Sequence, residues 1–129
     1  MCTSILQIAK DGSHILARTM DWHVLAVQPL FVPRGYQWES VYHNRVHTNR
    51  YAMIGGGGVH HHEIDVSDGV NETGLSVQKL TFVNGSQLVD EPTPGRVQLA
   101  PYEFSFYLLG HYASVADIEA HLDEIQLMT

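Results

Sequence analysis

The single cysteine of the chain stands at position 2, directly behind the initiator methionine. Loss of Met1 would free the α-amine of Cys2, so that one residue could supply both a nucleophile and a base. A thiol has an ordinary pKa of about 8.5, and a nearby guanidinium raises the thiolate fraction at neutral pH. A free α-amine, with a pKa of about 7.7 to 8.0, can take the thiol proton and return it to a leaving amine. The position suggests covalent amide hydrolysis; a small apolar side chain on an edge strand is the alternative.

Asp21 and Arg18 are the candidate partners of Cys2. The letters KDG separate two apolar runs, which predicts a β-hairpin with Asp-Gly as a two-residue turn. Facing residues then have numbers that add up to 23, so Cys2 stands opposite Asp21 with Cβ atoms roughly 5 Å apart. A carboxylate there could hold the amine of residue 2. Arg18 faces Ile5 on the other side in this register, and a bulge or bend would have to bring it to the site.

The rest of the chain predicts a run of strands followed by two helices. The stretch PLFVPRGYQW is extended, YAMIGGGG is a strand running into a flexible loop, and SDGVNETGLSVQKLTF is a turn followed by a long strand. Residues 84–99 are polar, contain two prolines and predict a surface loop. One helix begins at Pro101, and a second, extending to Ile125, follows Ser114 as its N-cap. This order indicates an α+β fold.

Composition sets the class of protein. At 129 residues, 14.4 kDa and 44% hydrophobic residues, the chain predicts one domain spanning 1–129 with its own core. A net charge of −7 without a basic stretch argues against nucleic acid or an anionic membrane as a partner. A lone cysteine fits a reducing compartment, and no leader or membrane-spanning run is evident. We therefore expect a cytoplasmic protein without a lipid anchor.

Two other motifs could suggest a ligand. In HHHE, His60 and His62 would share one face of a strand and could bind one ion, but no cysteine or HExxH spacing accompanies them. The run GGGG lacks the Lys-Ser/Thr of a phosphate-binding loop. We therefore predict neither a dedicated metal site nor a cofactor. Among the aromatic residues, Trp22 beside Asp21 is the one expected near a pocket.

The stretch DGVNETGL contains three polar residues that could act as metal ligands or as an acid/base pair, namely Asp68, Asn71 and Glu72. Turn chemistry explains them better, because Asp and Asn favour turns and glycines accept positive φ. We therefore predict a turn before a strand, with Gly69 and Gly74 at positive φ.

Several motifs together resemble the choloylglycine hydrolase family, which contains penicillin V acylases and conjugated bile salt hydrolases. The motifs are MCTSI, DGSHILARTMDW, FVPRGY, YAMIGGG and DGVNETGLSVQKLTF, in the family's order and at nearly its positions. The resemblance runs from residue 1 to about residue 125. It implies an N-terminal nucleophile hydrolase with an αββα sandwich fold, of which this chain carries the N-terminal half.

The resemblance also implies a role for four residues. Cys2 would be the nucleophile with its α-amine as base, Arg18 the arginine beside the thiol, and Asp21 the carboxylate that orients the amine. Thr81 falls where bile salt hydrolases usually carry Asn and penicillin V acylases often carry Tyr. The backbone N–H at that position contributes to the family's oxyanion hole, and such a donor does not depend on the side chain.

The resemblance is partial in length. Family members are more than twice as long, and a second oxyanion donor and a further active-site Arg lie in the portion absent here. Two hypotheses follow: an amidohydrolase acting on penicillin V or a conjugated bile salt, or a truncated, inactive member or fragment that needs a partner chain. The segment YEFSFYLLGHY is apolar enough to need a covering layer. We expect a homo-oligomer in which a second copy provides it.

Overall fold

The computed structural model describes residues 2–24, 26–42, 45–61, 63–81, 85 and 87–129. Its strands are β1 (Ser4–Ile8), β2 (His14–Arg18), β3 (Gln28–Val32), β4 (Gln37–Glu39), β5 (Val46–Thr48), β6 (Met53–His60), β7 (Glu63–Asn71), β8 (Ser76–Gln78), β9 (Val97–Leu99) and β10 (Ile125–Leu127). The helices are α1 (Phe104–His111) and α2 (Val115–His121), with 3₁₀ turns at Pro101–Glu103 and Leu122–Glu124. The predicted α+β class is confirmed.

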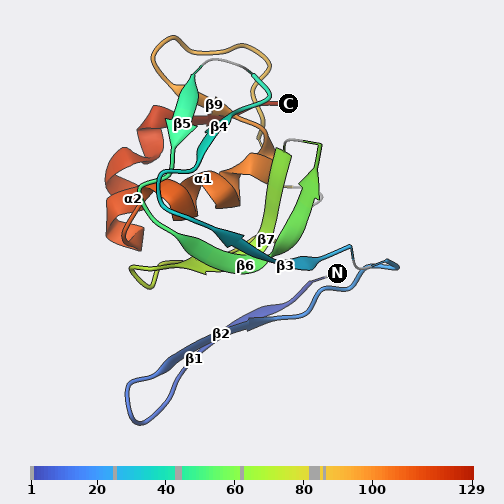
Figure 1. Ribbon diagram of the computed structural model, residues 1–129, viewed down its shortest axis with the longest axis vertical. Helices are drawn as coiled ribbons and strands as arrows, with labels where there is room; N and C mark the ends of the chain where they lie inside the picture. The colour runs from blue at the N-terminus through green and yellow to red at the C-terminus, as the bar shows by residue number, and fades with distance from the viewer. Residues whose placement is uncertain (1, 25, 43–44, 62, 82–84, 86) are drawn as a thin grey trace.

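A four-stranded antiparallel sheet in the order β3-β6-β7-β8 is the centre of the fold. Helix α1 packs on one face of this sheet, and the β1–β2 hairpin lies beyond the other face (Figure 1). Two smaller pairs complete the fold, antiparallel β4–β5 and parallel β9–β10. The hairpin that begins at the candidate nucleophile therefore faces the sheet without a helix between them.

The glycine run lies inside β6, so the predicted flexible loop is wrong. A Cβ on Gly55 would lie 2.2 Å from the carbonyl oxygen of Asp68, and one on Gly57 would lie 2.0 Å from that of Asp65. Real Cβ atoms do not approach an oxygen so closely, so only glycine lets β7 pair with β6 at these points. The glycines are needed for close strand approach rather than for flexibility.

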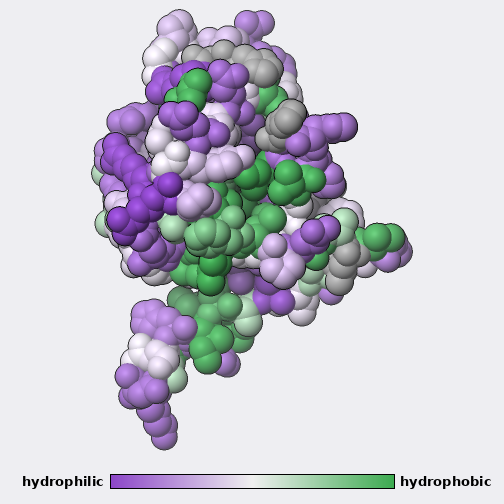
Figure 2. Space-filling model, in the orientation of Figure 1, coloured by the Kyte–Doolittle hydropathy of each residue, from purple (hydrophilic) through white to green (hydrophobic). Residues whose placement is uncertain are grey.

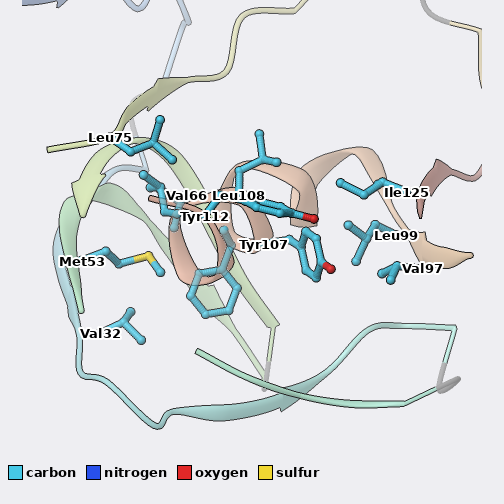
Figure 3. Close-up of a cluster of buried hydrophobic side chains, with 12 residues drawn as sticks. Val32, Met53, Val66, Leu75, Val97, Leu99, Tyr107, Leu108, Tyr112 and Ile125 are labelled. Atoms are coloured by element: carbon cyan, nitrogen blue, oxygen red, sulfur yellow. The ribbon is translucent and has the colours of Figure 1, made fainter. Parts of the chain in front are cut away.

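The core lies between the four-stranded sheet and α1. Figure 3 shows its side chains gathered around the helix, from strands on one side and from the β9–β10 pair on the other. Phe106, Leu109 and Leu99 are almost completely inaccessible to solvent. Burial of each such side chain contributes about 1.5–3 kcal/mol, so this layer holds α1 against the sheet.

Local signals located the start of both helices. Pro101 opens the 3₁₀ turn that leads into α1, and the Ser114 hydroxyl accepts a hydrogen bond from the Asp117 N–H at 3.1 Å. The end of the second helix differs from the prediction, because Ile125 leaves the helical path and pairs with Val97 as part of β10. Residues 97–99, predicted as loop, are accordingly a buried strand. Burial in a long-range strand pair determined both differences.

Helix α1 is covered within this chain. Every residue from Ser105 to Gly110 is buried, so the expectation that this helix needs a second copy as its covering layer is wrong. Exposed apolar side chains occur on the hairpin, where Ile5, Leu6, Ile8 and Ile15 are each more than half exposed. Figure 2 shows apolar side chains where the hairpin meets the rest of the molecule.

A buried aromatic cluster joins β4 and β5 to α1. His47 is 4% exposed; its ring centroid lies 4.7 Å from that of Trp38, 5.3 Å from that of Tyr107 and 5.7 Å from that of His111. Its Nε2 has no hydrogen-bond partner among the described residues. Burial lowers the pKa of His47 to about 4, and His111 and Arg45 add to the effect. The imidazole is therefore held neutral in the folded protein.

Acid is expected to destabilise the fold through His47. Its folded pKa of about 4 lies below the ordinary 6.5, so the unfolded chain binds the proton first as the pH falls. The contribution of neutral His47 to the free energy of unfolding is fully present above about pH 6.5. It falls by about 3 kcal/mol when the pH is lowered to 4. Burial lowers the pKa of His111 too, so it contributes with the same sign. Urea unfolding of the wild type and of His47→Phe at pH 6.5 and at pH 4 measures this decrease in stability. An equal decrease in the variant would contradict the assignment of the effect to His47.

Candidate active site

The turn of the β1–β2 hairpin contains three residues rather than two. The Ala9 N–H donates to the Ser13 carbonyl at 2.8 Å, and the Gly12 N–H donates to the Ala9 carbonyl at 3.0 Å. Gly12 has φ +86°, the left-handed conformation that follows a type I turn in three-residue hairpin loops. Facing residues therefore have numbers that add up to 22, and the predicted register is wrong by one.

This register moves Arg18 to the face that carries Cys2. Arg18 lies opposite Ser4, not opposite Ile5. Successive residues of a strand point to alternate faces, so Cys2, two residues before Ser4, belongs to the face of Ser4 and Arg18. The bulge or bend that the predicted register required is unnecessary. The thiol of Cys2 is free and partly buried.

Asp21 is not directly opposite Cys2. Extending the register by two residues places Met20 there, so the predicted pairing of Cys2 with Asp21 is wrong. Thr19 connects the two regions instead: its hydroxyl donates to Asp21 Oδ2 at 3.4 Å and accepts a hydrogen bond from the Thr3 N–H at 3.1 Å. Asp21 is thus linked to the backbone of the residue that follows Cys2.

The side chain of Arg18 crosses from the hairpin to the central sheet. It is 7% exposed, its Nε donates to the Thr19 carbonyl at 3.2 Å, and its Nη1 donates to the Ser67 carbonyl at 3.4 Å. The same Nη1 lies 3.9 Å from Asp68 Oδ2. Two of its three partners therefore come from β7, a strand about fifty residues further along the chain.

A bulge in β7 presents these two partners. Gly56 pairs with Asp68 and Gly57 pairs with Val66, which leaves Ser67 as the extra residue. The predicted turn at Asp68 and the predicted positive φ at Gly69 are both wrong, because the strand continues to Asn71. Bulges re-aim neighbouring groups, and no local signal distinguishes them from turns. Asp68 was therefore missed as a residue near the site.

A cavity of about 240 Å³ brings two of the four candidate residues, Arg18 and Thr81, together. Its walls are Arg18, Met20, Trp22, Asp65, Ser67, Lys79 and Thr81. Arg18 and Thr81, 63 positions apart in sequence, thus border one space, and Trp22 lies at a pocket as expected. Lys79 forms an ion pair with Asp65 in the wall. The walls therefore combine the Arg18 cation, the Lys79–Asp65 ion pair and the aromatic ring of Trp22.

The motifs considered for metal binding form no site within the described residues. His60 ends β6, His61 follows in a turn with φ 58°, and His62 lies outside the described residues. No group of three His, Cys, Asp or Glu side chains suited to a metal ion occurs in the described part of the chain. None of the described helices is long and apolar enough to cross a membrane.

A second, larger cleft of about 930 Å³ separates the hairpin from the outer face of the central sheet. The hairpin contributes His14, Leu16 and Arg18, and the sheet contributes apolar side chains that include Phe31 and Ile54. Phe31 is 69% exposed and Ile54 is 57% exposed. Two apolar layers therefore face each other here without full contact, next to the candidate site.

Comparisons with known proteins place these features in a family. A family model for linear amide C–N hydrolases of the choloylglycine hydrolase family matches residues 2–129. The bile salt hydrolase/transferase of Clostridium perfringens is 27% identical over 129 residues, which are 99% of this chain and 39% of that protein. The chain spans about two fifths of the length of the curated relatives it matches.

Solved structures agree with this match. The crystal structure of the C2A variant of the conjugated bile acid hydrolase from Clostridium perfringens has a TM-score of 0.88 and 26% identity, covering 99% of this chain and 39% of that one. The penicillin V acylase from Agrobacterium tumefaciens shares the fold, with a TM-score of 0.80 and 22% identity over 100% of this chain and 40% of that one. The 129 residues therefore belong to the choloylglycine hydrolase family of linear amide C–N hydrolases.

Proposed function

We propose that the protein hydrolyses linear amide bonds with Cys2 as an N-terminal nucleophile. The observation that carries this proposal is the cavity shared by Arg18 and Thr81, on the hairpin face to which the register assigns Cys2. Removal of Met1 is required, because a residue-2 nitrogen in a peptide bond cannot act as a base.

In this mechanism, the free amine of Cys2 takes the thiol proton and the thiolate attacks the substrate carbonyl. The backbone N–H of Thr81 donates to the resulting oxyanion, and the protonated amine returns its proton to the leaving amine. Water then hydrolyses the thioester and restores the thiol. Arg18 favours the thiolate, and Asp21, linked through Thr19, orients the amine.

The proposed substrate is penicillin V or a conjugated bile salt. We propose that the enzyme is cytoplasmic and acts without a cofactor and without a nucleic acid or membrane partner. The similarity to the bile salt hydrolase/transferase of Clostridium perfringens and to the penicillin V acylase from Agrobacterium tumefaciens supports these two amides. The cavity also suits a small amide, because Trp22, 59% exposed, offers an apolar surface beside the cationic groups.

The alternative is that residues 1–129 are the N-terminal part of one larger hydrolase domain and need a partner chain to act. The exposed faces of the hairpin and the cleft beside it support this alternative, because apolar layers of this extent are normally covered. Loss of one oxyanion donor typically costs about 10²–10³ in kcat, so an incomplete site would be slow or inactive.

We also propose that the isolated chain self-associates through the hairpin. Sedimentation velocity over a concentration series is expected to show dimers or larger species that dissociate on dilution. Ile15→Lys places a charge on the exposed hairpin face and should leave a monomer, whereas Val115→Lys, on exposed α2, is the matched control. A monomeric wild type would refute this part of the proposal.

The function is tested by intact mass and by release of free amine from penicillin V and glycocholate. A mass lacking Met1 together with product release supports an active enzyme. A chain that has lost Met1 but shows no turnover is then mixed with the C-terminal portion of the Clostridium perfringens bile salt hydrolase. Turnover in this mixture supports the partner-dependent alternative. No turnover in either case refutes the proposed activity.

A further inference from the structure

Arg18 is a buried cation, and its burial requires compensation. Its side chain is 7% exposed and spans the space between the hairpin and β7. A buried guanidinium without a counter-charge is costly, whereas one that is paired and hydrogen-bonded is tolerated. The carboxylate of Asp68, whose Oδ2 is 3.9 Å from Arg18 Nη1, supplies that counter-charge from the opposite layer.

The chain makes room for this carboxylate. The bulge at Ser67 shifts the register between Gly56 and Gly57. A Cβ on Gly56 would lie 3.0 Å from Asp68 Oδ1 and 2.9 Å from a Val27 methyl carbon, so the glycine leaves the space that the carboxylate occupies. Glycine and bulge thus act together to seat Asp68 near Arg18.

The contacts hold the guanidinium in one orientation. Nε is directed to the Thr19 carbonyl on the hairpin, while Nη1 is directed to the Ser67 carbonyl and Asp68 on β7. Without its contacts to β7, the Arg18 side chain could turn toward the larger cleft between the hairpin and the sheet, which Arg18 also lines. The position of the cation relative to Cys2 therefore depends on the sheet as well as on the hairpin.

We propose that Asp68 is a positioning residue that holds Arg18 on the face of the hairpin that carries Cys2, and so maintains the reactivity of the thiol. This inference rests on the proposed function, in which Arg18 favours the thiolate. Asp68 acts through Arg18 and does not itself contact the substrate.

The sign of the effect distinguishes positioning from simple electrostatics. Asp68 is an anion, so its removal alone would favour a nearby thiolate and speed its reactions. If Asp68 positions Arg18, its removal lets the guanidinium move away and slows them. A purely structural role would change the melting temperature but not the pH profile of the thiol.

The test is the rate of iodoacetamide alkylation of the full 129-residue chain from pH 5 to 10. Because Cys2 is the only cysteine in the sequence, the signal comes from one site. Arg18→Leu is expected to slow alkylation at pH 7 about tenfold, because the thiolate loses its neighbouring cation. Asp68→Asn is expected to slow it about three- to fivefold, because the guanidinium can then move away from the thiol. Glu72→Gln, which removes a carboxylate paired with Arg34 just beyond β7 and outside this cavity, should not slow it.

The outcomes separate this inference from the proposed function. An unchanged rate in Arg18→Leu would refute the role of the arginine in the proposed function, and the inference with it. If Arg18→Leu slows alkylation but Asp68→Asn leaves the rate unchanged or raises it, only the inference is overturned. Equal slowing in Glu72→Gln would overturn it too. If Asp68→Asn fails to fold, Asp68→Glu replaces it: a rate within about twofold of wild type supports the counter-charge role, and an accelerated rate overturns it.

Discussion

Replacing Cys2 with alanine is expected to lower amide hydrolysis by about 10⁴-fold or more. The variant has no atom that can form the thioester, although its free amine and the cavity around Arg18 and Thr81 remain. Release of free amine from penicillin V and glycocholate, measured under the conditions in which the wild type or its complex turns over, provides the number. The thiol is partly exposed, so the fold should hardly change.

Two controls make this result specific. Cys2→Ser keeps a hydroxyl nucleophile of much higher pKa, and we expect residual activity between that of alanine and wild type. Thr3→Ala alters the adjacent residue without touching the thiol; since the hydrogen bond to Thr19 comes from the Thr3 backbone, it should keep most of the activity. Hydrolysis that survives in Cys2→Ala would rule out the nucleophile and the mechanism built on it.

Asn71→Ala is expected to lower the free energy of unfolding by about 3–5 kcal/mol. The side chain is 3% exposed, and its Nδ2 donates to the carbonyls of Leu109 and Tyr112 at 2.9 and 2.8 Å. Its Oδ1 accepts hydrogen bonds from the Thr73 N–H, the Thr73 hydroxyl and the Leu75 N–H. One amide therefore joins the end of β7, the following turn and the C-terminal end of α1.

The lower free energy of unfolding should be visible in urea unfolding at pH 7, where protonation of His47 does not reduce stability. Thr73→Val is the matched control, because it removes the hydroxyl bonds of that residue but leaves both bonds from Asn71 to α1; about 1 kcal/mol is expected. A decrease below 1 kcal/mol in Asn71→Ala would show that the helix end finds other partners and that this amide does not join the layers.

Turn chemistry could be predicted only in part from DGVNETGL. Asn71 and Gly74 do form the turn, the latter with φ +91°, because their effects are local. Asp68 and Gly69 belong to the strand before it, and nothing in the local sequence marks that boundary. The distinction came from pairing with β6, a long-range interaction that overrides local preference.

The hairpin illustrates how a single residue of register changes a site. The letters KDG fit both a two-residue and a three-residue loop, and the choice moved Arg18 from the face of Ile5 to that of Ser4. A one-residue shift reverses the face of every side chain on a strand. The conformation of Gly12 and its bond to Ala9 determined the outcome, which composition alone does not specify.

The sequence alone determined the family, the α+β class, both helix starts and the four candidate residues, because motif order and capping signals are local and directly visible. Tertiary structure decided which of those residues meet: Arg18 and Thr81 share a cavity, whereas Asp21 reaches the N-terminal strand through Thr19. It also decided that the glycine run is a strand, that Asp68 lies near Arg18, and that His47 is buried in its neutral form. Each of these depends on distances between segments far apart in the chain, which only packing establishes.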